Sequence, residues 1–169
     1  MILQKIRPDF KIIPCRGNIQ TRLDKLSAKG APDAIILACV GLKRLGIFDE
    51  KYCFPLAVDM MIPSAGQGTI AIEKRFDDQK MADICKKINH LPSWYLSAAE
   101  REFLAYFEAS CKTPIAAYAE YIDESIIKAR YMYGDFKGNC LEFHRETGDK
   151  MHGKEIAIKA AKIIEAKKY

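Results

Sequence analysis

Apolar residues recur every three or four positions in several segments of the chain, which is the spacing of amphipathic helices. Turn and capping residues separate these segments. Gly30 follows the second segment as a helix stop, and Asp77 or Asp78 is suited to cap the fourth. The predicted helices cover residues 1–6, 19–29, 41–46, 78–88, 93–107 and 150–167.

Continuous and alternating apolar runs predict strands elsewhere. Residues 33–39 are nearly all apolar, as in a strand buried inside a parallel sheet, and residues 10–14 and 69–74 predict two shorter strands. Three further runs, joined by short polar connections at 123–124 and 134–139, predict an antiparallel meander. These three strands cover residues 115–121, 126–133 and 140–145.

The order of these elements predicts two architectures in one chain. Strands and helices alternate up to about residue 47, which predicts an α/β unit with parallel strands. A helix, three strands and a final helix predict a small α+β module after a boundary near 89–93. The Gly66–Gly68 triplet does not predict a dinucleotide site, because a strand rather than a helix is predicted to follow it.

The composition is that of an ordinary soluble globular protein, with an apolar share of 49% and a charged share of 29%. No apolar run reaches the ~18 residues that a membrane span needs. The first residues lack the apolar core and cleavage site of a signal peptide. We therefore expect a cytoplasmic protein with no membrane partner.

The net charge of +5 favours an anionic partner, either a nucleic acid or a small molecule with many carboxylates. Basic residues are mostly interspersed with acidic ones, and no nucleic-acid-binding motif is recognisable. We expect no nucleic-acid partner. The six cysteines include no Cys-x-x-Cys pair, and the three histidines form no His-Glu-x-x-His motif. We therefore expect reduced thiols and no metal site.

One cysteine, Cys111, lies where a helical pattern ends and the first strand of the meander begins. Ser110 and Pro114 are turn formers, so we expect this cysteine to be accessible from one side. The residues themselves leave two interpretations open. Cys111 is either a small residue packed in a loop or, because a thiolate is a good nucleophile, a point of covalent attachment.

Three arginines follow predicted strands: Arg16, Arg22 and Arg44. In an open α/β sheet, ligands bind beyond the carboxyl ends of the strands, so the three side chains could face one crevice. A guanidinium group pairs with carboxylates in a bidentate manner. The alternative interpretation is that all three are solvated surface residues.

Seven motifs occur along the chain in a specific order and spacing. They are Arg16–Leu26, Asp33–Ala38, Gly41–Gly46, Gly66–Gly68 with Ile72–Arg75, Asp77–Asp78, Glu100–Arg101 and Cys111–Ile115. As an ordered set they resemble the porphobilinogen deaminase family, also called hydroxymethylbilane synthase. The resemblance covers nearly the whole chain.

The resemblance implies a transferase of tetrapyrrole (porphyrin and heme) biosynthesis. The family condenses four porphobilinogen molecules head to tail into the linear tetrapyrrole hydroxymethylbilane and releases ammonia. It implies a covalent dipyrromethane cofactor, attached through a thioether to Cys111. It also implies that Arg16, Arg22 and Arg44 bind carboxylates of the cofactor and of the substrate, so the partners are porphobilinogen and the growing polypyrrole chain.

The same resemblance implies three segments. Residues 1–62 correspond to the later part of the family's second α/β domain, a partial periplasmic-binding-protein-like domain with a mixed sheet. Residues 63–88 correspond to the segment that completes the first domain. Residues 89–169 correspond to the C-terminal α+β domain, which carries the cofactor cysteine.

The chain departs from the family in two respects. The family's N-terminal portion, with its catalytic aspartate, precedes the part that matches, so the catalytic residue in this chain is unknown. Three explanations stay open: a split gene with a separate N-terminal half-chain as partner, a misplaced start or incomplete sequence, or a fragment that has drifted from catalysis. This chain alone is expected to be inactive if no such partner is supplied. Ala109 and Ser110 stand where the family has glycines. The alternative function is a truncated, non-catalytic module that binds an anionic ligand or a partner chain.

Overall fold

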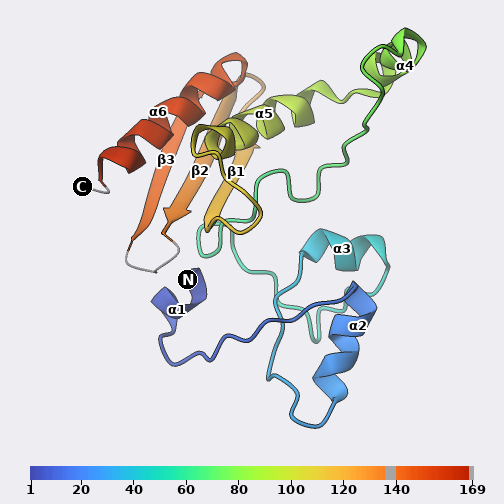
Figure 1. The fold of residues 1–169 in the computed structure, drawn as a ribbon, viewed down its shortest axis with the longest axis vertical. Helices are drawn as coiled ribbons and strands as arrows, with labels where there is room; N and C mark the ends of the chain where they lie inside the picture. Colours follow the sequence, from blue (N-terminus) through green and yellow to red (C-terminus); the bar gives the residue numbers. More distant parts are fainter. Residues whose placement is uncertain (136–139, 168–169) are drawn as a thin grey trace. The chain divides into compact units, whose positions relative to one another are not determined.

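The computed structural model describes residues 1–135 and 140–167 (Figure 1). The chain divides into two compact units. The N-terminal unit is Ile2–Ala57, and the C-terminal unit is Met1 together with Val58–Tyr169. Residues 136–139, within the predicted connection 134–139, lie outside the described residues.

The N-terminal unit contains short helices joined by extended chain: α1 (Ile2–Ile6), α2 (Ile19–Asp24), the 3-10 helix η1 (Lys25–Ser27) and α3 (Cys39–Arg44). The side chain of Asn18 caps α2 by accepting hydrogen bonds from the Thr21 backbone N–H and hydroxyl, both at 2.8 Å. A Cβ atom on Gly41 would lie 2.8 Å from Ile19 Cδ1. Glycine at this position therefore allows α2 and α3 to pack closely.

Three predicted strands are wrong. Residues 10–14, 33–39 and 69–74 are not in strands, and α3 begins at Cys39, inside the second of them. Side chains in these segments are exposed: Ile36 is 53% and Ile70 is 73% exposed. An apolar run favours an extended backbone, but a strand forms only where a neighbouring strand accepts and donates its hydrogen bonds. The described part of the chain pairs no strand with these segments.

The C-terminal unit matches its prediction closely. Its elements are α4 (Gln79–Ile88), α5 (Leu91–Tyr106), β1 (Ile115–Tyr121), β2 (Ile126–Gly134), β3 (Leu141–Asp149), the 3-10 helix η2 (Lys150–His152) and α6 (Gly153–Ala166). Asp78 is the residue that caps α4, because its carboxylate accepts the Met81 N–H at 2.8 Å. The strands form an antiparallel sheet in the order β1-β2-β3, which confirms the predicted meander. The presence of both helices and a three-stranded sheet is consistent with the predicted α/β fold class.

Helices α5 and α6 lie side by side on one face of this sheet (Figure 1). The alternation of β2 directs Ile127, Ala129 and Tyr131 toward the helices, where each is fully buried. Phe103 of α5 stacks on Tyr131 with ring centroids 4.5 Å apart. Alanines at the helix contacts, and Gly153 packed against Ala99, let the two helices approach closely. This layer is the hydrophobic core.

The opposite face of the sheet carries Arg130, which is 6% exposed. Its Nε donates a hydrogen bond to Asp59 at 2.6 Å, and Arg145 donates one to the same carboxylate oxygen at 3.0 Å. Arg130 NH1 also forms an ion pair with Glu120, at 2.8 Å from a carboxylate oxygen. These charges hold the segment around Asp59 against the sheet.

Candidate functional site

Cys111 lies in a turn between the end of α5 and the start of β1. Ser110 and Thr113 close this turn: the Ser110 N–H donates to Thr113 Oγ1, and the Thr113 N–H donates to the Ser110 carbonyl, both at 3.0 Å. The Lys112 N–H donates to Ser110 Oγ at 3.3 Å. Cys111 is exposed, whereas the other five cysteines are partly buried. The prediction of an accessible cysteine in a turn is confirmed.

The turn begins where α5 ends on a left-handed residue. Glu108 has φ = 47°, a conformation that costs a residue other than glycine roughly 1 kcal/mol or more. The Glu108 N–H donates to Ala105 and the Ala109 N–H donates to Leu104, both at 3.0 Å, and these bonds terminate the helix. At position 110, serine supplies a hydroxyl that takes part in the turn, which glycine could not do.

The three predicted arginines lie in the N-terminal unit, on α2, on α3 and in the loop that precedes α2. Arg16 is exposed in the loop before α2, and within the described ranges its guanidinium has no hydrogen-bond or ion-pair partner. Arg22, on α2, uses its Nε to donate to the Gly17 carbonyl at 2.7 Å. Lys25 donates to the Arg16 carbonyl at 2.7 Å. Arg44 is exposed at the C-terminal end of α3.

This arrangement presents cations around one loop. The Ile19–Gly41 contact brings the start of α2 against α3, so the elements that carry the arginines are neighbours. Arg22 donates one of its five N–H groups, that of Nε, to the Gly17 carbonyl in the loop. Such a set of guanidinium groups is suited to bind carboxylates. The predicted attachment residue, Cys111, belongs to the C-terminal unit and not to the unit that carries these arginines.

Glu100 is a residue for which no separate role was predicted beyond its place in the Glu100–Arg101 motif. It lies on α5, is 7% exposed, and accepts backbone N–H groups from Gly66 at 2.6 Å and Ala119 at 2.8 Å. Burial raises the pKa of the Glu100 carboxyl, and the two backbone hydrogen bonds oppose that rise. A signal was present, because Glu100 stands on the same helical face as Leu96 and Phe103.

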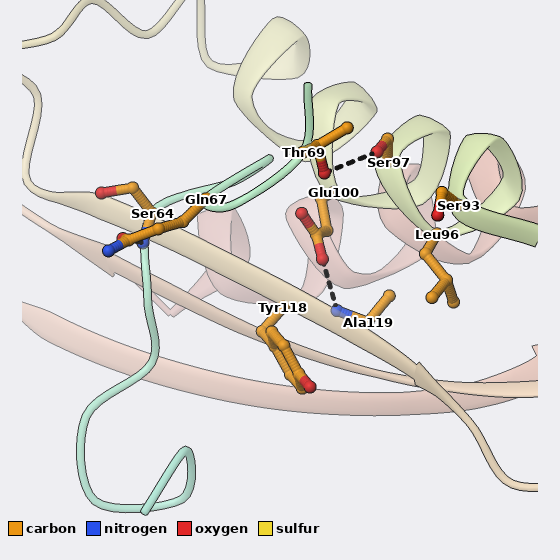
Figure 2. A pocket seen from close by; sticks show the side chains of 9 residues that line it. All are labelled: Ser64, Gln67, Thr69, Ser93, Leu96, Ser97, Glu100, Tyr118 and Ala119. Carbon is orange, nitrogen blue, oxygen red and sulfur yellow. Dashed lines mark hydrogen bonds between the residues drawn. The ribbon is translucent and has the colours of Figure 1, made fainter. Parts of the chain in front are cut away.

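A small pocket of about 160 Å³ opens beside Glu100 (Figure 2). The residues with hydroxyl groups that line it are Ser64, Thr69, Ser93, Ser97 and Tyr118. The hydroxyls of Thr69 and Ser97 lie 3.4 Å apart. Across the described ranges, no group of three or more His, Cys, Asp or Glu residues is placed to hold a metal ion. The pocket therefore offers hydrogen bonds and one carboxylate.

Within the described residues, no helix is both long enough and apolar enough to cross a membrane.

Comparison with known proteins relates both halves of the chain to one family. Residues 1–83 match the family model "Porphobilinogen deaminase, dipyromethane cofactor binding domain", and residues 94–166 match "Porphobilinogen deaminase, C-terminal domain". Three relatives named porphobilinogen deaminase come from Rickettsia species. Those of Rickettsia bellii (strain OSU 85-389), Rickettsia prowazekii and Rickettsia canadensis are 46%, 46% and 45% identical over 164, 162 and 162 residues.

These alignments cover 96–97% of this chain and 54% of each relative's length. The chain therefore spans about half the length of the curated relatives it matches. Because the two family models together match most of its residues and the identity extends along nearly all of it, the chain belongs to the porphobilinogen deaminase family.

Proposed function

We propose that this chain takes part in the hydroxymethylbilane synthase reaction: the stepwise condensation of four porphobilinogen molecules into a linear tetrapyrrole, with loss of ammonia at each step. The observation that carries the proposal is the exposed Cys111 in its closed turn, in a chain whose two segments match the two family models. A cysteine that serves only as packing would be buried.

In this proposal the Cys111 sulfur holds a dipyrromethane cofactor through a thioether. The carbon–sulfur bond forms at the methylene carbon that loses ammonia, and the thiol proton leaves with the amine. Each added ring then lengthens the chain at its far end. The exposed position of Cys111 leaves room for such a group.

Arg16, Arg22 and Arg44 bind the carboxylates in this proposal. Every pyrrole ring carries an acetate and a propionate, so the growing chain gathers negative charge with each step. Guanidinium groups neutralise that charge, and each charge-assisted hydrogen bond contributes about 1.5–3 kcal/mol. The exposed guanidinium of Arg16 and the contact between α2 and α3 support this role.

We further propose that a separate N-terminal half-chain completes the fold in the cytoplasm. The exposed apolar runs that contain Ile36 and Ile70 are suited to become strands of a mixed, periplasmic-binding-protein-like sheet when neighbouring strands are supplied. The apolar face of α4, with Ile84 43% and Ile88 57% exposed, is suited to cover such a sheet. The catalytic aspartate of the family would come from that partner. The division into 1–62, 63–88 and 89–169 stays a prediction.

A second candidate is a non-catalytic module that binds an anionic ligand or a partner chain. The same exposed arginines and exposed apolar runs favour it, because neither feature requires chemistry at Cys111. The two candidates differ in whether a pyrrole group becomes attached to sulfur.

Intact mass spectrometry separates them. The full chain is expressed alone and together with a polypeptide that covers the preceding part of the Rickettsia bellii relative, then incubated with porphobilinogen. We expect a mass increase of two pyrrole units that is lost in Cys111→Ser and kept in Cys39→Ser, the matched control at the start of α3. An adduct that survives Cys111→Ser would show that the site assignment is wrong. No adduct in either preparation would favour the non-catalytic module.

A further inference from the structure

Glu100 is a buried carboxylate that is stabilised by hydrogen bonds from backbone N–H groups instead of by a cation. Among the residues that the structure describes, no lysine, arginine or histidine forms an ion pair with it. Its Oε2 accepts the Gly66 N–H at 2.6 Å and its Oε1 accepts the Ala119 N–H at 2.8 Å. A buried charge is costly unless it is hydrogen-bonded, so both donors are needed to keep it there.

The two donors belong to different segments. Ala119 is on β1, an edge strand of the sheet, and its N–H would otherwise be unpaired at that edge. Gly66 is in the loop that precedes Thr69, some 34 residues before Glu100 in the chain. The Glu100 side chain therefore joins three segments: the loop, α5 and β1. Figure 2 shows its bond to Ala119 of β1.

The loop is shaped to present the Gly66 N–H. The Gln67 N–H donates to the Ser64 carbonyl at 3.1 Å, and the Thr69 N–H donates to the Gly66 carbonyl at 3.0 Å. Gly66 has φ = 70°, the left-handed conformation that favours glycine. With these bonds made inside the loop, the Gly66 N–H is left for Glu100.

Residues of this loop contact the core and α5, whereas the apolar side chains that follow it are exposed. Ala65 packs against the hydrophobic core, and the Thr69 hydroxyl lies 3.4 Å from that of Ser97 on α5. Beyond it the apolar side chains are exposed, with Ile70 at 73% and Phe76 at 99%. The loop is thus attached to the α5–β1 pair, while the chain that follows it is not attached in this way.

We infer that Glu100 is a positioning residue: it fixes residues 63–69 to the α5–β1 pair that flanks the Cys111 turn, so that movement of residues 70–88 relative to this pair pivots after Thr69. The inference concerns backbone geometry and holds whether or not the chain carries out the proposed reaction. It places the flexible joint before α4, about 20 residues earlier than the predicted boundary at 89–93.

A carboxylate is the side chain that these two hydrogen bonds require. It is purely an acceptor and meets one donor with each oxygen. Glutamine has nearly the same size but offers one acceptor oxygen, and its NH2 group would face a backbone N–H. Glu100→Gln therefore removes one of the two bonds with little change of volume. Glu102→Gln is the matched control on the same helix, because Glu102 forms a surface ion pair with Lys154 at 3.6 Å.

Amide hydrogen exchange on the full chain, followed residue by residue by NMR, tests the inference. In Glu100→Gln we expect the Gly66 amide to exchange about tenfold faster or more. The rise at Gly66 should exceed that of the Tyr131 amide in the core strand β2, and Glu102→Gln should change neither. Unchanged exchange at Gly66, or an equal rise at Gly66 and Tyr131, would overturn the inference, since the second result indicates a general loss of stability.

A second measurement needs no variant and decides the matter if Glu100→Gln does not fold. A scalar coupling across the hydrogen bond, between the Gly66 amide nitrogen and the Glu100 carboxyl carbon, is expected in the unaltered protein. Its absence under conditions where backbone couplings within the sheet are detected would overturn the inference.

Discussion

The N-terminal unit and the sheet of the C-terminal unit contain similar apolar runs, but only those of the sheet form buried strands. Ile36 stands in the middle of a nearly all-apolar run and is 53% exposed, whereas Ile127 stands in β2 and is fully buried. The strands that pair with β2 are its neighbours along the chain, separated by short connections. The run around Ile36 has no paired strand within the described residues.

An apolar run is necessary for a buried strand but does not by itself produce one. Burial of a strand depends on partners that satisfy its backbone and cover its side chains. The meander finds both partners within about 35 residues, and α5 and α6 cover one face. Three substitutions test this difference, each measured by chemical denaturation of the full chain.

The largest effect is expected for Phe103→Ala. Phe103 is fully buried and packs on Tyr131 at 4.5 Å, so its removal leaves a cavity and should lower the free energy of unfolding by about 3–5 kcal/mol. The matched substitution Ile36→Ala removes an exposed side chain and should change it by about 0.5 kcal/mol or less. Equal losses in the two variants would show that the run around Ile36 is buried and that the comparison is mistaken.

A smaller effect of opposite sign is expected for Tyr131→Phe. The Tyr131 hydroxyl is buried and, among the described residues, has no hydrogen-bond partner. Burial also raises the pKa of this phenol. Because an unsatisfied buried hydroxyl is costly, its removal should raise the free energy of unfolding by about 1 kcal/mol. A clear loss of stability would mean that the hydroxyl has a partner, such as a bound water molecule.

The smallest effect is expected for Asp59→Asn, and it should depend on pH. The hydrogen bond from Arg130 holds the pKa of the Asp59 carboxyl below its usual value. A lowered pKa in the folded state contributes stability above the unfolded-state pKa, and this contribution is lost as the pH falls through the folded-state pKa. The unaltered protein should therefore exceed the variant in stability at neutral pH, and the difference should shrink below about pH 4.

A stability difference between the two proteins that does not change with pH would show that the Asp59 charge is not what holds this segment to the sheet. Lys86, which pairs with Asp83 at 3.7 Å on the surface of α4, provides a control. Asp83→Asn should leave the free energy of unfolding at neutral pH nearly unchanged, because a surface ion pair contributes little.

Prediction of the candidate site succeeded where the signal was local. The turn at Cys111 could be predicted because Ser110 and Pro114 are turn formers between a helical and a strand pattern, and the structure adds the bonds to Thr113. The two hydrogen bonds of Glu100 could not be predicted, because their donors, Gly66 and Ala119, are distant from it in sequence. The position of this acidic residue on an apolar helix face carries no information about those partners.

By itself the sequence determined the helices of the C-terminal unit, the three-stranded meander and the family. Helix periodicity, capping by Asp78 and the turn at Cys111 depend on interactions within a few residues. Tertiary structure alone decided which apolar runs become strands, as the contrast between Ile36 and Ile127 shows. It also decided which backbone N–H groups donate hydrogen bonds to Glu100. Both outcomes depend on hydrogen-bonding partners that are brought together from distant parts of the chain, and a local pattern carries no information about them.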